Sequence, residues 1–250
     1  MEISISAYKY VGYTLLKHII DIGTEVKFVT TIKDYDDPYF YKIKEICHDN
    51  NIPIHIDLDI NSDQFRTLLL SNNIDLHFML WFPTIVKKKS IKSVNKGFVN
   101  LHPSLLPYNR GMHPWYWSIV DKTPAGVTIH FIDEKIDNGP IIAQKEVKIT
   151  TTDTGETLYS KLVDEIIKLF IKTFGSIINN QYTIINKIGN QTFHLAKELN
   201  ENSNIDLNKV YKAEDLINII RARTFTSGKN AYFYKNGIKY NIKLEISRDE

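Results

Sequence analysis

The chain has 250 residues, of which 43% are hydrophobic and 12% aromatic, so it can bury the core of one large domain, with or without a small appendage. Its formal net charge of +2 favours neither a nucleic acid nor an anionic membrane as a partner. The charged fraction of 24% is ordinary and argues against disorder. The run Lys87–Lys89 is a candidate local basic site, for which a solvated loop or helix start is the simpler explanation.

The cysteine count and the hydropathy narrow the class of protein further. Cys47 is the only cysteine, which excludes an intramolecular disulfide and a structural zinc site built on thiolates. Residues 1–10 show no basic segment followed by an apolar stretch, and no segment approaches the roughly 20 apolar residues of a membrane span. The stretch 162–178 carries Asp, Glu and Lys at helical spacing, which predicts an amphipathic core helix. We therefore expect a soluble cytoplasmic protein.

The first hundred residues alternate between strand and helix patterns. Strands are predicted over 2–8, 25–31, 52–56, 74–82 and 96–101, and helices over 11–23, 41–51 and 62–73, with a lysine-rich helix after Pro83. Gly23 stands where a helix C-terminal glycine is expected, and Ser62 or Asp63 can cap the third helix. This alternation predicts an α/β fold with a doubly wound, mostly parallel sheet.

The second half breaks the alternation. Two strands are predicted around a loop in 125–149, followed by a long helix from about 154 to 179. Residues 185–209 are polar and loop-like, and they lead to a short helix over 213–224 and a hairpin over 229–246 with its turn at Asn236-Gly237. We place a domain boundary near residue 180. Residues 1–180 are then the main domain, and 181–250 are a small helix-plus-hairpin appendage that packs on it or on a partner subunit.

Ligands of doubly wound sheets bind beyond the carboxyl ends of the strands. The segments to inspect are therefore 8–10, 81–83 and 100–107, which follow three predicted strands. The first turn contains one glycine, not the G-x-G-x-x-G pattern, and the chain has no G-x-x-x-x-G-K-[ST] motif. A dinucleotide-dependent dehydrogenase and a P-loop nucleotidase are both disfavoured.

A metal site is a weaker alternative. Three histidines and two aspartates fall in one stretch and are residue types that bind zinc or iron: His102, His113, His130, Asp133 and Asp137. None of them has the H-E-x-x-H spacing. His130 is also explained as a residue on the sheet face opposite Val127, Ile129 and Phe131.

Asn100, His102 and Asp137 suggest acyl-transfer chemistry. Asn100 and His102 are two residues apart at a strand end, so their side chains can point to the same side, and Pro103 keeps His102 extended. An Asn amide can stabilise a developing oxyanion, His can take a proton from an attacking amine, and Asp can orient the imidazole. Residues 100–107 are equally explained as a turn rich in turn-forming residues.

Two motifs in this region carry a family resemblance. The sequences NLHPSLLPYNRG, at 100–111, and GVTIHFIDEKIDNGPIIAQ, at 126–144, resemble the folate-dependent formyltransferase family. That family includes the enzymes that formylate glycinamide ribonucleotide, methionyl-tRNA and the amines of nucleotide-linked sugars. The resemblance covers roughly residues 1–180 and implies a Rossmann-like formyltransferase core. It also implies that Asn100, His102 and Asp137 form the catalytic triad.

The resemblance further implies a cofactor and its site. The formyl donor would be N10-formyltetrahydrofolate, with no metal. Its pterin would lie in an apolar slot between the segment after the fourth strand and the acidic loop. The implied cofactor-binding residues are Phe82, Thr84, Ile85, Asp133 and Ile136.

The tail indicates the branch of the family. Its roughly seventy residues carry nearly balanced charge, so they lack the basic surface that a transfer-RNA substrate needs. The purine-pathway enzymes resemble the core but lack such a tail. Residues 205–242 are similar to the tail of sugar-nucleotide formyltransferases, and compact chains of that branch act on dTDP-linked amino-dideoxy sugars. The segment 110–121 stands where those enzymes meet the sugar and nucleotide, and Trp115 or Trp117 is a candidate for stacking there or for the core.

The sequence thus predicts a transferase that formylates a dTDP-linked 3- or 4-amino-dideoxyhexose for surface polysaccharide such as lipopolysaccharide O-antigen. Lys9 is a candidate contact for the diphosphate, and Arg110, His113 and Trp115 are candidate substrate contacts. The aromatic terminal hairpin, with unpaired strand edges, predicts a homodimer. Three alternatives remain: a formyltetrahydrofolate hydrolase, a non-catalytic sugar-nucleotide or folate-binding module, and a metal hydrolase.

Overall fold

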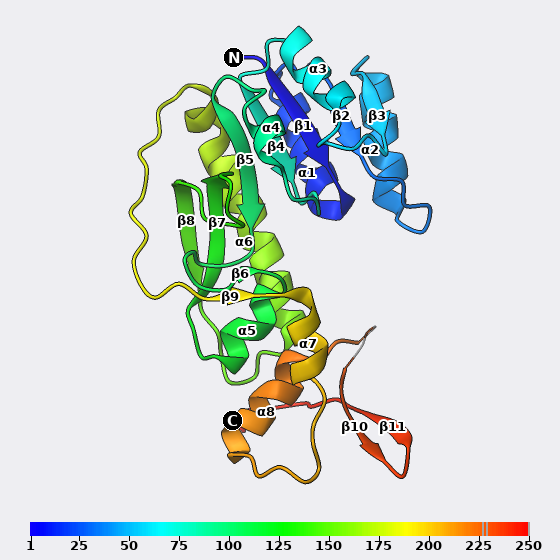
Figure 1. Cartoon of the computed structure of the whole chain (residues 1–250), viewed down its shortest axis with the longest axis vertical. Helices are drawn as coiled ribbons and strands as arrows, with labels where there is room; N and C mark the ends of the chain where they lie inside the picture. The colour runs from blue at the N-terminus through cyan, green and yellow to red at the C-terminus, as the bar shows by residue number, and fades with distance from the viewer. Residues whose placement is uncertain (227, 229, 250) are drawn as a thin grey trace. The chain divides into compact units, whose positions relative to one another are not determined.

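The computed structural model describes residues 1–226, 228 and 230–249, and Figure 1 shows their course. The chain folds into two compact units. Unit 1 comprises residues 1–102, 128–143 and 166–186, and unit 2 comprises residues 103–127, 144–165 and 187–250. Three elements begin in one unit and end in the other, namely strands β7 (Ala125–Phe131) and β8 (Ile141–Val147) and helix α6 (Gly155–Ile178).

A seven-stranded sheet has the order β3-β2-β1-β4-β5-β7-β8. Its other strands are β1 (Ile3–Ala7), β2 (Val29–Thr31), β3 (Ile54–Ile56), β4 (Leu76–Leu80) and β5 (Gly97–His102). The strands β3, β2, β1, β4 and β5 pair in parallel, and β7 pairs antiparallel with β5. The predicted α/β class with a mostly parallel sheet is confirmed, and each strand predicted in the first hundred residues is present.

The helices of the first half connect the parallel strands (Figure 1). They are α1 (Lys9–Asp21), α2 (Pro38–Asp49), α3 (Asp63–Ser71) and the short α4 (Lys88–Ile91). Ser62 caps α3, because its Oγ accepts the backbone N–H of Phe65 at 3.1 Å. Gly23 follows α1 with a φ of 77°, the left-handed conformation that glycine adopts without steric cost. Both predicted helix-end signals are confirmed.

Side chains of β4 alternate between two packed faces of the sheet in unit 1. Phe78 contacts Phe170 and Phe174 of α6, with ring centroids 5.8 and 5.5 Å apart. Its neighbour Met79 belongs instead to a buried cluster with Phe28, Phe65, Leu69 and Phe98, among others. Because successive residues of a strand point to opposite faces, helices cover both sides of the sheet, as a doubly wound fold requires.

Unit 2 holds shorter elements. These are β6 (Arg110–Gly111), α5 (Pro114–Val120), β9 (Phe193–His194), α7 (Ala196–Asn202), α8 (Ala213–Ala222), and the hairpin strands β10 (Ala231–Lys235) and β11 (Ile238–Ile242). β6 pairs in parallel with β9, and β10 pairs antiparallel with β11 across the Asn236-Gly237 turn. The long helix, α8 and the terminal hairpin were predicted, and all three are present.

Two helices of unit 2 were not predicted. The α5 segment is a run of aromatic and aliphatic residues without a polar face, and the α7 segment is almost wholly polar, so neither shows an amphipathic period. Tyr116 of α5 is fully buried and its hydroxyl donates to Asn202 of α7 at 2.6 Å, so tertiary contacts fix both helices. Among the described residues, no helix combines the length and the apolar character needed to cross a membrane. The domain division at residue 180 stays a prediction.

Candidate active site

Four polar side chains of unit 1 converge at the end of β5. Asn100 and His102 come from β5, His130 from β7, and Asp137 from the loop between β7 and β8. His102 Nδ1 lies 3.5 Å from Asp137 Oδ2, and Asn100 Nδ2 lies 3.5 Å from Asp137 Oδ1. The side chains of His102 and Asp137 are only 8% and 12% exposed. The three residues that the sequence singled out are therefore brought together.

His130 belongs to the same group, a role that the sequence did not reveal. The antiparallel register sets His130 directly opposite Asn100, and the Nδ2 atom of Asn100 lies 3.3 Å from His130 Nε2. The other ring nitrogen lies 2.8 Å from the carbonyl oxygen of Phe131. Because a carbonyl only accepts, Nδ1 of His130 carries the proton. In the neutral ring Nε2 then accepts the amide N–H of Asn100, and it lies 3.7 Å from Asp137 Oδ1 as well. His130 thus orients the Asn100 amide.

The loop that carries Asp137 is held by its own backbone geometry. Asp137 has a φ of 46°, in the left-handed region. Two residues later, a Cβ on Gly139 would lie 1.7 Å from the carbonyl oxygen of Phe131, so only glycine fits. Asp133 closes the loop, since its carboxylate accepts the Lys135 backbone N–H at 2.9 Å and the Asn138 amide at 3.2 Å. The Asp-Asn-Gly-Pro motif therefore fixes where the Asp137 carboxylate lies.

The residues predicted to bind the cofactor lie on two adjacent segments of unit 1. Phe82 is 8% exposed and belongs to the buried cluster against which Ile132 packs. Lys88 forms an ion pair with Glu134 at 2.7 Å, which ties the end of the first segment to the loop after β7. Two large apolar side chains remain exposed on these segments, namely Ile85 at 66% and Ile136 at 37%. Thr84 lies on the first segment, where its N–H donates to the carbonyl of Phe82 at 3.0 Å.

Lys9 lies in unit 1 where β1 leads into α1. It has a φ of 54°, its side chain is exposed, and its Nζ lies 5.2 Å from the ring centroid of Tyr8. The Tyr8 hydroxyl donates to Asp34 Oδ2 at 3.1 Å, and burial, followed by this bond, raises the pKa of Tyr8. The start of α1 therefore presents a cation at the carboxyl end of β1.

The remaining predicted substrate contacts lie in unit 2. Arg110 donates to Gln191 Oε1 at 3.1 Å and its guanidinium lies over the ring of Phe193. His113 precedes α5 with a φ of 59°, and burial, followed by the charge of Arg223, lowers its pKa. Trp115 packs edge-on against the ring of Tyr159 with centroids 4.9 Å apart, and it is partly exposed.

The predicted metal candidates do not assemble into a ligand set. Within residues 1–226, 228 and 230–249, no group of three or more His, Cys, Asp or Glu side chains is arranged to hold a metal ion. His113 lies in unit 2, whereas His102 and His130 lie in unit 1 with Asp133 and Asp137. The arrangement in unit 1 is instead that of a carboxylate beside an imidazole and an amide, which suits proton transfer next to a developing negative charge.

Comparison with known proteins gives two family matches. Residues 57–174 match the formyl transferase family, and residues 198–248 match the N-formyltransferase dimerization C-terminal domain. Among solved structures, a 4-N formyltransferase from Francisella tularensis is 28% identical with a TM-score of 0.82, covering 99% of this chain and 98% of that one.

Two curated relatives are also similar. The bifunctional polymyxin resistance protein ArnA of Wigglesworthia glossinidia brevipalpis is 30% identical over 228 residues, which is 90% of this chain and 35% of that protein. The dTDP-4-amino-4,6-dideoxyglucose formyltransferase of Mycobacterium bovis is 37% identical over 153 residues, 61% of this chain and 65% of that protein. The chain thus spans about a third and just under two thirds of these relatives. With two family matches and a full-length structural likeness, the chain belongs to the formyl transferase family.

Proposed function

We propose that this protein transfers a formyl group from N10-formyltetrahydrofolate to the amine of a dTDP-linked amino-dideoxyhexose, in the cytoplasm, for surface polysaccharide. The observation that carries the proposal is the pairing of His102 with Asp137 beside Asn100 in unit 1. The name of the Mycobacterium relative supports a dTDP-linked sugar acceptor, and the names of this relative and of the Francisella protein both favour a 4-amine over a 3-amine.

The folate fits the apolar residues on the two segments described above. Ile85 and Ile136 are exposed large apolar side chains on adjacent segments, and an apolar ring system would cover them. We propose that Phe82, Thr84, Ile85, Asp133 and Ile136 hold the pterin. When bound, the folate supplies an activated formyl carbon.

Each residue of the triad then has a separate role in the proposed reaction. With His102 Nδ1 donating toward Asp137, Nε2 carries the lone pair that takes a proton from the attacking amine. The negative Asp137 stabilises the imidazolium that results. The Asn100 amide has two N–H groups: one donates to His130 Nε2, and the other, now 3.5 Å from Asp137 Oδ1, would turn to the charge that develops on the formyl oxygen.

The remaining predicted contacts are proposed for the acceptor. Lys9 would neutralise part of the diphosphate, because it places an exposed cation at the carboxyl end of β1. Arg110, His113 and Trp115 of unit 2 are proposed contacts of the sugar or base. In this proposal residues 1–180 supply catalysis and these substrate contacts, and 181–250 supply dimerisation and further substrate contacts.

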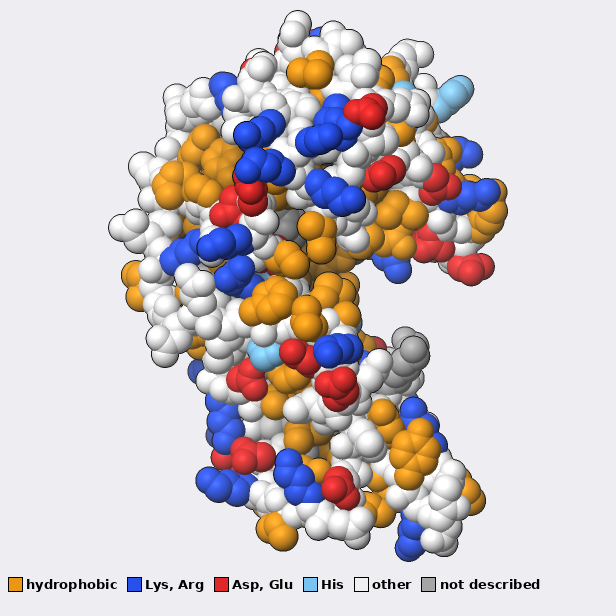
Figure 2. Space-filling model, in the orientation of Figure 1, with side chains coloured by type: hydrophobic (Ala, Val, Ile, Leu, Met, Phe, Trp, Pro, Cys, Tyr) orange, Lys and Arg blue, Asp and Glu red, His pale blue; other side chains and the backbone are white. Residues whose placement is uncertain are grey.

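We also propose a homodimer formed through the terminal hairpin. Tyr234, Ile238 and Tyr240 are 53%, 57% and 43% exposed, and Figure 2 shows apolar side chains at the surface over the β10–β11 region. The family match over 198–248 carries the description of a dimerization domain. Light scattering of Ile238→Asp tests this: the variant is expected at half the mass of the wild type, and a monomeric wild type at micromolar concentration would overturn it.

One assay tests the reaction. The chain is incubated with N10-formyltetrahydrofolate and a panel of dTDP- and UDP-linked 3-amino and 4-amino sugars, and the products are weighed by mass spectrometry. We expect one formyl group on a dTDP-linked 4-amino sugar, and none with His102→Gln. Release of formate without an amine would favour the hydrolase, and an untouched cofactor with bound ligand would favour the binding module.

A further inference from the structure

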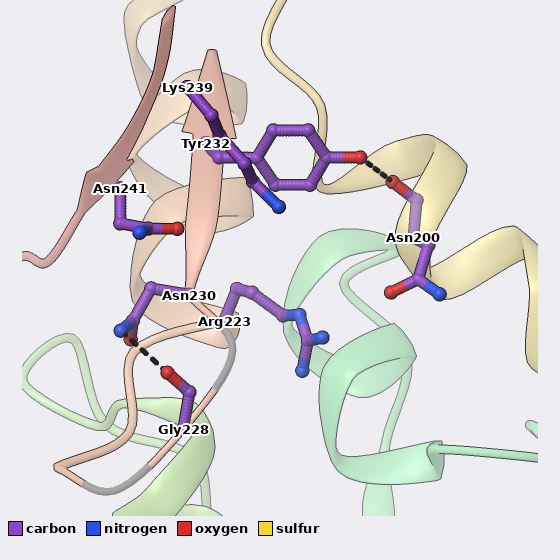
Figure 3. Close-up of a pocket in the computed structure, with 7 residues that line it drawn as sticks. All are labelled: Asn200, Arg223, Gly228, Asn230, Tyr232, Lys239 and Asn241. Atoms are coloured by element: carbon purple, nitrogen blue, oxygen red, sulfur yellow. Dashed lines mark hydrogen bonds between the residues drawn. The ribbon is translucent and has the colours of Figure 1, made fainter.

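A pocket lies wholly within unit 2, in the C-terminal part of the chain. It has a volume of about 440 Å³, which is in the range of small-molecule sites. Its lining comes from α7, the segment after α8 and both strands of the hairpin, and Figure 3 shows the residues: Asn200, Arg223, Gly228, Asn230, Tyr232, Lys239 and Asn241. These residues include two cations, three carboxamides and one phenol, and no acid. The pocket therefore has the chemistry of an anion site.

Arg223 differs from the neighbouring Arg221 in its hydrogen bonds. Arg221 is 9% exposed, its Nε donates to Asn218 at 2.8 Å, and its Nη1 donates to the carbonyl oxygen of Asp153 at 2.8 Å. Arg223 has a buried Nε with no hydrogen-bond partner among the described residues, and no described carboxylate lies within ion-pair distance of it. Burial lowers the pKa of Arg223, because its guanidinium is partly removed from water.

Lys239 adds a second cation to the same pocket. Its Nζ lies 3.7 Å from the ring centroid of Tyr232, and it forms no ion pair with any carboxylate that the structure describes. The Tyr232 hydroxyl is fixed in turn, because it donates to the carbonyl oxygen of Asn200 at 3.3 Å. In Figure 3 the charged ends of Lys239 and Arg223 and the amide of Asn200 are directed into the region that they surround.

The floor of the pocket is held in place by Asn230, which is 6% exposed. Its Oδ1 accepts the backbone N–H of Phe225 at 3.1 Å and its Nδ2 donates to the carbonyl oxygen of Gly228 at 3.0 Å. The side chains of Asn200 and Asn241 are exposed and line the pocket, so they can bond to an uncharged part of a ligand.

We propose that this pocket binds a small phosphorylated metabolite, with its phosphate between Arg223 and Lys239. A guanidinium binds a phosphate through parallel N–H bonds, and an ammonium adds a second charge against a group that carries close to two negative charges. The pocket is much larger than one phosphate needs, so the rest of the molecule lies against Tyr232 and the carboxamides. The residues of this pocket lie in unit 2, whereas those of the triad lie in unit 1.

Calorimetry of the full chain with inorganic pyrophosphate at low salt tests the proposal. The Arg223→Gln and Lys239→Gln variants are each expected to weaken binding at least tenfold. Lys235→Gln is the matched control, because Lys235 belongs to the same hairpin but does not line the pocket, and it is expected to bind like the wild type. Lys9→Gln is expected to retain this binding, which separates it from any diphosphate contact in unit 1.

Hydrogen exchange locates the site independently. Pyrophosphate is expected to protect amides of β10 and β11 in the wild type and in Lys235→Gln, and not in the double variant Arg223→Gln/Lys239→Gln. Equal affinity in all four single variants, or no saturable binding, would overturn the proposal. Tighter binding of citrate than of pyrophosphate would overturn the assignment of a phosphate.

Discussion

Two buried histidines on adjacent strands of the same sheet have opposite chemistry. His77 of β4 is fully buried, and each ring nitrogen lies 2.8 Å from a serine hydroxyl, Nδ1 from Ser4 and Nε2 from Ser6. His102 of β5 is 6% exposed and faces the carboxylate of Asp137 at 3.5 Å. Burial lowers the pKa of His77 to about 3, so its ring stays neutral at neutral pH.

The two rings differ in their partners as well as in burial, which is complete for His77. A hydroxyl can donate to or accept from a neutral ring, but it adds no charge that would stabilise an imidazolium, whereas a carboxylate does. His77 therefore serves packing and hydrogen bonding, while His102 is equipped to accept a proton. Four experiments test this contrast, from the largest expected effect to the smallest.

Removing the imidazole of His102 is expected to give the largest loss of activity. In His102→Gln, kcat/KM for formyl transfer should fall by about 10³-fold, because general-base catalysis is lost while the fold is kept. Activity and thermal unfolding are measured together. His48→Gln is the control, since its side chain is 90% exposed and its partner, Asp49 at 3.3 Å, is exposed as well, so this variant should behave like the wild type. Near-normal turnover of His102→Gln would contradict the mechanism.

Removing the imidazole of His77 should have the opposite profile. His77→Ala leaves a cavity and deprives the buried Ser4 and Ser6 hydroxyls of their shared partner, at a cost of about 3 kcal/mol in the free energy of unfolding. Urea denaturation measures that loss. Turnover per folded molecule should be unchanged, and a loss of activity in fully folded His77→Ala would break the contrast.

Removing the imidazole of His130 is expected to cost less activity than removing that of His102 and more than removing that of His77. In His130→Leu the Asn100 amide loses the acceptor that orients it, so kcat is expected to fall by about 30-fold, while KM changes little. Because His130 acts through Asn100, the His130→Leu/Asn100→Ala double variant should be no slower than Asn100→Ala alone. Independent, multiplicative losses would show a separate role.

The free energy of unfolding should depend on pH through His77. Its folded pKa lies near 3 and its unfolded pKa near 6.5, so between these values the unfolded chain binds a proton that the folded chain does not. The contribution of His77 is therefore complete above about pH 6.5 and declines as the pH falls, by about 1.4 kcal/mol per pH unit. Unfolding curves at pH 7 and pH 5 should show a smaller difference for His77→Gln than for the wild type. Equal differences would refute this.

The sequence predicted most of the sheet and three of the four residues at the site. Asn100 and His102 were readable because they follow a strand and because Pro103 restricts the chain, and Asp137 because its glycine-containing loop follows another strand. His130 was not readable, because its role depends on the antiparallel register that sets it opposite Asn100. The alternation of residue types along a strand predicts which face of the sheet each side chain occupies. It does not predict which residue of the neighbouring strand lies opposite.

The pocket in unit 2 could not be predicted from the sequence either. Arg221 and Arg223 are two residues apart at the end of one helix. Nothing in their spacing shows that Arg221 bonds to Asn218 and Asp153, whereas the buried Nε of Arg223 has no partner among the described residues. Helices α5 and α7 were missed because long-range contacts, and not an amphipathic period, stabilise them.

The interleaved course of the chain has a consequence for recombination between relatives. The tail is anchored within unit 2 by residues from earlier stretches: Arg221 bonds to the carbonyl of Asp153, Phe225 packs against Trp115, and β9 pairs with Arg110 in β6. A recombination crossover near residue 180 would join the tail of one relative to residues 103–127 and 144–165 of another relative, which evolved to contact a different tail. Residues 103–127, 144–165 and 187–250 should therefore vary together among relatives, and a working chimaera has to exchange all three stretches at once.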